Sequence, residues 1–210
     1  MELLSFLKGI GIGLAVAVPV GPIGILCIQR SLSQGYLVGL LTGLGSAVAD
    51  AIYGAVAAFG LGTAATVLVE QSIWFRLVGG AFMLILGLRI MRTRTGRTTA
   101  DLAANNSLSR VAAFNAFGSS LVLTLANPTT ILSFVAIFAG LGLVEAANHF
   151  SAGSAMVAGV FLGSILWWVV LSGAASRLGG LAGEKRVRWI SRISGAVIIG
   201  FGVAAVASLL

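Results

Sequence analysis

One carboxylate lies deep inside an apolar segment of this chain. Asp50 is near the middle of the apolar run from Tyr36 to Gly62. An ionised carboxylate at the centre of a bilayer is costly, so it indicates a functional site, as a proton carrier or a counter-ion for a substrate ammonium group. The alternative is a structural Asp that caps a broken helix or pairs with a polar group. At helical spacing its neighbours are small or polar, which predicts a face toward protein or water: Gly43, Ser46, Tyr53 and Gly54.

Two proline motifs interrupt apolar segments near the start of each half of the chain. The first contains Pro19, Gly21 and Pro22, and the second contains Asn127, Pro128 and Thr129, with Asn115 earlier in the same segment. Proline removes a backbone donor, and broken backbone at membrane depth survives only beside protein or a wet cavity. Paired interruptions of this kind predict the central site of a transporter. The alternative is that both prolines only kink helices for packing.

The expected chemistry of these breaks follows from the backbone groups that they free. Helix N-termini that begin after Pro22 and Pro128 would present N–H groups to a substrate carboxylate. Carbonyl groups before each break would suit a cation or an ammonium group. The side chains of Asn127, Thr129 and Asn115 would add hydrogen bonds. We therefore expect these residues to line a substrate or ion pathway together with Asp50.

Composition indicates that lipid surrounds most of this chain. Hydrophobic residues make up 58% of the sequence and charged residues 9%, with a mean hydropathy of +1.06. Soluble domains carry about 25% charged residues. The net charge of +7 comes from bases in short loops, which favours an orientation signal over nucleic-acid binding. We therefore predict a single membrane transport domain over residues 1–210 that contacts membrane lipid and binds no nucleic acid.

Six apolar segments are long enough to be membrane spans, for which about 20 residues are needed. They are Leu4–Ile28, Tyr36–Gly62, Ile73–Met91, Val111–Val144, Ala152–Ala175 and Trp189–Leu210. The first and fourth contain the proline motifs, so each is expected to be a broken helix. The predicted fold is an all-α membrane protein with six transmembrane helices.

The two halves of the chain are related by an internal repeat. The run from Gly21 to Leu26 aligns with the run from Asn127 to Leu132, and Leu44-Gly45-Ser46 aligns with Leu162-Gly163-Ser164. Further along, Gly80 and Gly87 align with Gly195 and Gly202, whereas Asp50 aligns with Trp168. Repeat one covers about residues 1–91 and repeat two about 111–210, with a cytoplasmic linker over 92–110. Because each repeat has three spans, the second copy must be inverted.

The basic residues predict the orientation in the membrane. With both termini outside, all Lys and Arg except Lys8 and Arg76 fall on the inside. The inside segments would hold Arg30, Arg89, Arg92, Arg94, Arg97, Arg110, Arg177, Lys185, Arg186, Arg188 and Arg192. Positive residues accumulate on the cytoplasmic side of membrane proteins. Both termini are therefore expected outside, on the periplasmic face.

The motifs together resemble the LysE/RhtB family of amino acid exporters. The resemblance is carried by Val18-Pro19-Val20-Gly21-Pro22, by Asn127-Pro128 with Phe134 and Phe138, and by Gln29-Arg30, Gly35, Gly39, Gly43, Gly45, Asp50 and Tyr53. It covers nearly the whole chain. It implies an exporter of amino acids or related small molecules in the bacterial inner membrane, driven by the proton gradient. A homodimer is a further possibility.

Two other functions are alternatives to export. A CcdA-like electron-transfer membrane protein also has proline-broken helices, but it needs two thiols and this chain has only Cys27. A small channel or metal-ion exporter of the same superfamily would need more acidic or thiol ligands in the membrane than Asp50. His149 stands alone, and no nucleotide motif or Ser/His/Asp set is present. We therefore expect no enzyme activity, no cofactor and no metal site.

Overall fold

The computed structural model describes residues 2–19, 21–59, 72–92, 110–127, 130–131, 133–134, 136–137, 150–181 and 184–209. In these ranges the chain is all-helical and contains no strand. The helices are α1 (Glu2–Ala17), α2 (Pro22–Gln34), α3 (Tyr36–Ala58), α5 (Ser72–Arg92), α7 (Arg110–Leu125), α9 (Phe150–Leu181) and α10 (Glu184–Ala207). This confirms the all-α class.

The first apolar segment is broken where its prolines predicted. Helix α1 ends at Ala17, α2 begins at Pro22, and the two helices are bent by 80°. Gly21 precedes α2 in an extended conformation, and Pro22 takes the first helical position, where its missing N–H costs no hydrogen bond. The second motif also lies at a helix end. Helix α7 ends at Leu125, and a new helical hydrogen bond begins between the Thr130 N–H and the Asn127 carbonyl.

Three described helices are long and apolar enough to cross a membrane. They are Tyr36–Ala58, Phe150–Gly179 and Lys185–Ala207, and counting the bent pair α1–α2 as one span makes four. Helix α7 adds a shorter apolar stretch, Val111–Leu125. The chain is therefore a multi-pass membrane protein. The full set of six spans stays a prediction, because the search covers only the described residues.

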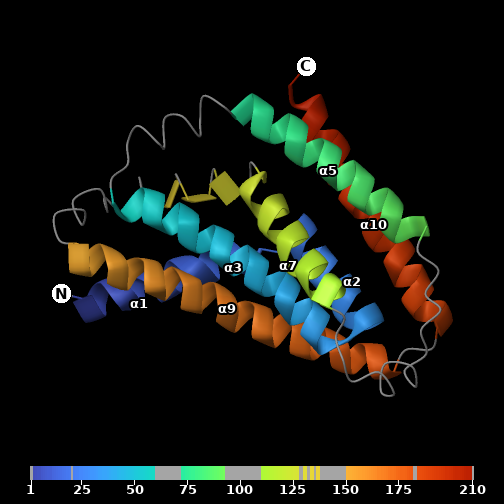
Figure 1. Cartoon of the computed structure of the whole chain (residues 1–210), viewed down its shortest axis with the longest axis horizontal. Helices are drawn as coiled ribbons and strands as arrows, with labels where there is room; N and C mark the ends of the chain where they lie inside the picture. Colours follow the sequence, from blue (N-terminus) through green and yellow to red (C-terminus); the bar gives the residue numbers. More distant parts are fainter. Residues whose placement is uncertain are drawn as a thin grey trace.

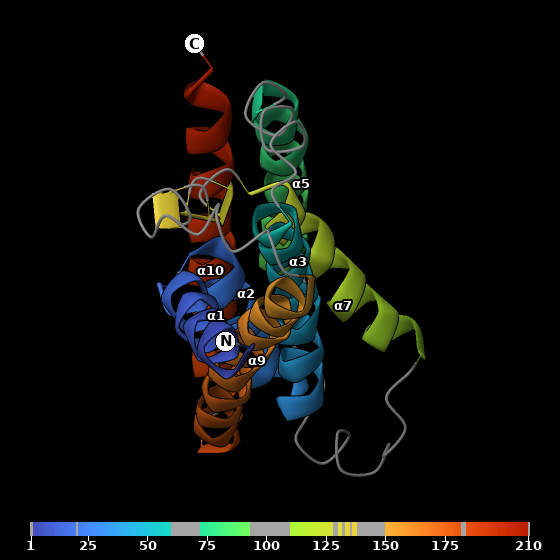
Figure 2. The same ribbon diagram turned by 90° about the vertical axis from the view of Figure 1, so that its left-hand side faces the viewer.

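The helices pack around a central antiparallel pair, α3 and α9 (Figure 1). Helix α1 lies along α9, α7 lies against α3, and α5 pairs with α10. Helix α2 contacts α3, α9 and α10 and so lies between these groups. Figure 2 shows α5 and α10 side by side, while the Arg110 end of α7 stands away from the other described helices.

Glycines allow the helix backbones to touch. A Cβ atom added at Gly13 of α1 would collide with the carbonyl oxygen of Val160 in α9. Gly11, two residues earlier, faces open space. In lipid no hydrophobic force drives helices together, so close backbone packing through small residues supplies much of the attraction. The α1–α9 contact therefore depends on particular glycines.

The same kind of contact recurs in the two halves. In α3, Gly45 packs on the carbonyl oxygen of Phe117 in α7. In α9, Gly163, which aligns with Gly45 in the repeat, packs on the carbonyl oxygen of Ile10 in α1. The contact of α3 with α7 thus has a counterpart in the contact of α9 with α1, and each of the two contacts joins one half to the other.

Helices α5 and α10 also pack through glycines, and each helix contributes two of them. Gly80 of α5 packs against Gly202 of α10, and Gly87 packs against Gly195. The repeat aligns Gly80 with Gly195 and Gly87 with Gly202, so exchanging the two halves exchanges these two contacts. Met83 and Ile198 lie buried between the two glycine positions of each helix.

Candidate functional site

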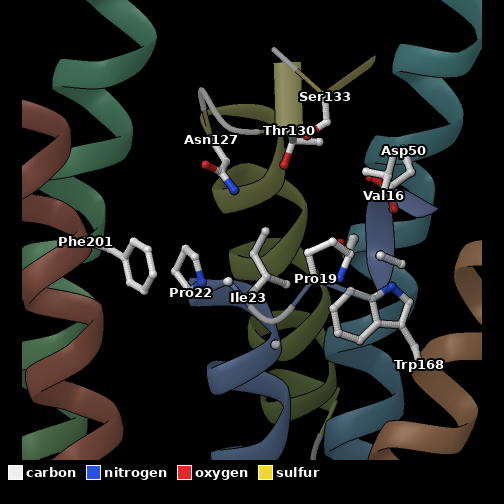
Figure 3. Close-up of a pocket in the computed structure, with 14 residues that line it drawn as sticks. Val16, Pro19, Pro22, Ile23, Asp50, Asn127, Thr130, Ser133, Trp168 and Phe201 are labelled. Carbon is white, nitrogen blue, oxygen red and sulfur yellow. The ribbon is translucent and has the colours of Figure 1, made fainter. Parts of the chain in front are cut away.

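A cavity of about 230 Å³ lies beside the break between α1 and α2 (Figure 3). Its walls are formed by residues of α1, α2 and the break between them, and by residues of α3, of the segment after α7, of α9 and of α10. They are Val16, Ala17, Pro19, Gly21, Pro22, Ile23, Gly24, Ser46, Asp50, Asn127, Thr130, Ser133, Trp168 and Phe201. The residues around both proline motifs therefore meet at one cavity.

Most of the predicted site residues line this cavity. They are Pro19, Gly21, Pro22, Ser46, Asp50 and Asn127. Tyr53 is buried one turn from Asp50, and its hydroxyl donates to the carbonyl of Leu125 rather than lining the cavity. Asn115 is exposed on α7 and does not belong to the described lining. Pro128 and Thr129 lie outside the described residues.

Asp50 is held by a short chain of hydrogen bonds from α9. Its side chain is 2% exposed, and its Oδ2 accepts a hydrogen bond of 2.7 Å from the Ser164 hydroxyl. The Ser164 oxygen in turn accepts one of 3.0 Å from the Trp168 indole N–H. Because an indole N–H can only donate, the hydroxyl proton of Ser164 is left for the carboxylate. These two hydrogen bonds fix the position of Asp50 at the cavity wall.

A hydrogen bond between two hydroxyl groups joins α3 to α7 beside Asp50. Ser46, one turn before Asp50, lies with its oxygen 3.1 Å from the hydroxyl oxygen of Thr124. Ser46 aligns with Ser164 in the repeat. The two aligned serines have different partners, since Ser46 contacts Thr124 of α7 and Ser164 contacts Asp50.

Sequence reasoning missed several residues that line the cavity or hold its acid. Trp168 and Ser164 carried a usable signal, because they align with Asp50 and Ser46 in the repeat. Thr130 and Ser133 follow the second proline motif closely enough to be suspected. Phe201 had no signal, since an aromatic residue in an apolar segment is ordinary and only the packing of α10 brings it to the cavity.

Comparison with known proteins identifies the family. The family model described as LysE type translocator matches residues 14–208. This chain belongs to the LysE type translocator family. The resemblance drawn from the proline motifs is confirmed. No solved structure matches this chain.

Three proteins similar to this chain come from bacteria. "Uncharacterized membrane protein YahN" of Escherichia coli is 34% identical over 81% of this chain and 75% of its own length. "Putative amino acid efflux protein YcgF" of Bacillus subtilis is 25% identical over 94% of this chain and 92% of its own length. "Chemotactic transduction protein ChpE" of Pseudomonas aeruginosa is 28% identical over 79% of each chain.

Away from the cavity, an arginine side chain is buried between helices. Arg30, expected in a loop on the inside, lies within α2, because that helix starts afresh at Pro22 and continues to Gln34. Its Nη1 donates to the Thr42 hydroxyl and to the Ala116 carbonyl, both at 3.0 Å, and its Nη2 donates to the Ser119 hydroxyl at 2.8 Å. Arg30 thus connects α2 to α3 and α7.

Arg30→Lys is expected to lower the stability of this LysE type translocator by about 2 kcal/mol, because an ammonium group cannot reproduce the planar fork that reaches three acceptors. The melting temperature in detergent should fall by about 5 °C. Arg177→Lys is the matched control, since Arg177 is exposed on α9. An equal melting temperature for Arg30→Lys and the wild type would show that the three hydrogen bonds contribute no net stability.

Proposed function

We propose that this chain is a secondary transporter that exports amino acids or related small molecules, driven by protons, through the cavity at the α1–α2 break. The observation that carries the proposal is the buried carboxylate of Asp50 in the wall of a cavity where both interrupted segments meet. A buried acid inside the membrane by default marks a substrate or ion pathway. Membership of a translocator family and a relative named for amino acid efflux agree with it.

The cavity offers complementary groups to the two ends of an amino acid. Helix α2 begins at the cavity with Pro22, Ile23 and Gly24, so its N-terminal backbone groups suit a carboxylate. In Figure 3 the side chains of Asn127 and Thr130 lie above Pro22 and Ile23, and all four residues line the cavity. Asp50 suits an ammonium group or a proton. A zwitterion can use both ends at once.

The proposed architecture is two inverted repeats of three spans each. The paired glycine contacts support it, because Gly45 of α3 packs on α7 in the same way as Gly163 of α9 packs on α1. Swapping each glycine for its partner in the repeat turns the Gly80–Gly202 contact into the Gly87–Gly195 contact. This supports a two-fold relation between α5 and α10. Such an arrangement places the site at the interface of the repeats, as in other secondary transporters.

The proposed location is the bacterial inner membrane with both termini outside. The C-terminal ends of α5 and α9 and the start of α10 lie at the same end of the molecule in Figure 1. These helix ends carry Arg89, Arg92, Arg177, Lys185 and Arg186. A basic end supports assignment of that end to the cytoplasm.

The proposal is tested by export from cells that make the protein. Cells are loaded with dipeptides, which peptidases cleave to free amino acids, and the medium is sampled over time. We expect at least one amino acid to leave several-fold faster than from vector-only cells, and a protonophore to remove the difference. A panel in which no amino acid leaves faster, with the protein shown to be folded in the membrane, would contradict the proposed function.

A further inference from the structure

We infer that the cavity selects amino acids with an uncharged, apolar side chain, with Asp50 and Trp168 holding the ammonium group and Phe201 and Pro22 contacting the side chain. The inference rests on the proposed function and adds the class of substrate. It follows from the way in which the cavity walls differ from one side to the other. Figure 3 shows Asp50 and Trp168 on one side and Phe201 on the opposite side, with Pro22 next to the phenyl ring.

The Asp50 side has two features that attract a cation. Asp50 and Trp168 are 2% and 3% exposed, and both line the cavity. A carboxylate forms strong hydrogen bonds with an ammonium group, and the face of an indole ring attracts cations. Ser164 donates to Oδ2 of Asp50, so one carboxylate oxygen already has a partner that fixes its orientation. The α-ammonium group therefore has a defined place.

Among the described residues, the Phe201 side of the cavity has no group that would compensate a second charge. The phenyl ring and the pyrrolidine ring of Pro22 are apolar, and Phe201 is 40% exposed at this edge of the cavity. Among the described lining residues, Asp50 is the only side chain with an ionisable group. A substrate with a basic or acidic side chain would place that charge beside apolar rings without a partner, and burying an unpaired charge is strongly unfavourable.

The size of the cavity fits one small molecule. A volume of about 230 Å³ corresponds to roughly eight water molecules at about 30 Å³ each. It lies below the roughly 300–1,000 Å³ of sites for drug-sized ligands. A single amino acid is of the right order.

The test is competition with radiolabelled leucine for the purified full-length protein in liposomes. Unlabelled leucine, alanine, lysine and glutamate are the competitors. We expect leucine to compete best and lysine and glutamate to compete about a hundredfold more weakly, because their side-chain charge would be unpaired. Lysine or glutamate competing as well as leucine would overturn the inference and leave the proposed function standing. No binding of any amino acid would remove the proposed function itself.

Phe201→Ala tests the side-chain contact directly. We expect about a tenfold loss of leucine affinity, since one or two apolar groups lose their partner. The affinity for alanine should stay within about twofold, which also shows that the variant is folded. Val203→Ala is the matched control, because Val203 lies on the same helix, is 53% exposed and does not belong to the described lining. Unchanged leucine affinity in Phe201→Ala would overturn the assignment of this wall to the substrate side chain.

Discussion

Asp50→Asn is expected to abolish proton-driven export while leaving the protein folded. Asparagine keeps the shape of the side chain and can still accept the hydrogen bond from Ser164, but it carries no charge. Loss of one partner of a buried charged pair costs about 2–5 kcal/mol, which corresponds to a loss of transport of at least about 30-fold. The measurement is substrate efflux from liposomes under an imposed pH gradient, with the amount of folded protein checked by size-exclusion chromatography.

Exchange without a gradient separates the two roles that Asp50 could have. If Asp50 only carried a proton, Asp50→Asn should retain part of its substrate exchange. If Asp50 holds the substrate ammonium group, as inferred above, exchange should be lost together with net export. Glu2→Gln removes a carboxylate from an exposed position on α1 and should leave both rates unchanged. Wild-type export by Asp50→Asn would exclude Asp50 from the mechanism.

Gly13→Val is expected to prevent assembly of α1 against α9. The new side chain would meet backbone atoms of Val160 and Ser164, which cannot move aside as a flexible side chain can. Overpacking in a dense core costs about 1–3 kcal/mol, and a collision with backbone lies at the upper end of that range or beyond it. Because Ser164 holds Asp50, the displaced helices would also disturb the cavity. We expect little monodisperse protein after extraction in mild detergent.

Gly11→Val is the matched control for this prediction. Gly11 lies on the same helix, is exposed and has no heavy atom near its potential Cβ position. The same added volume should therefore have little effect on yield. Equal yields from Gly11→Val and Gly13→Val would show that the close α1–α9 contact is not required for folding.

The cavity was predictable from sequence only where a residue was out of place in an apolar segment. Asp50 and the prolines stood out because an acid or a broken backbone has a high cost in lipid. Phe201 is a normal residue for a membrane helix, and only tertiary packing brings it to the cavity. Asn115 is polar and shares a segment with the second proline motif, but it lies exposed on α7 and is not part of the described lining.

The charge pattern predicts an orientation in the membrane, but it is misleading about the burial of one arginine. The sequence predicts that Arg30 lies in a loop, because a basic side chain after an apolar run normally lies at the membrane surface. In the structure it is buried in α2, since hydroxyl and carbonyl groups of α3 and α7 satisfy its guanidinium group. These partners come from distant parts of the chain, so no local pattern reveals them. The class of the fold and the first helix break, by contrast, depend on local composition.

The hydrogen bonds at the end of α2 determine how this helix can move. Arg30 connects it to α3 and α7, while the adjacent Gln29 donates to the Ser191 hydroxyl of α10 at 3.3 Å. Consecutive residues of a helix point about 100° apart. Helix α2 is thus held from two directions and cannot roll about its axis without breaking one set of bonds. A movement of α2 that changes the shape of the cavity must therefore break at least one set of bonds or carry the neighbouring helices along with α2.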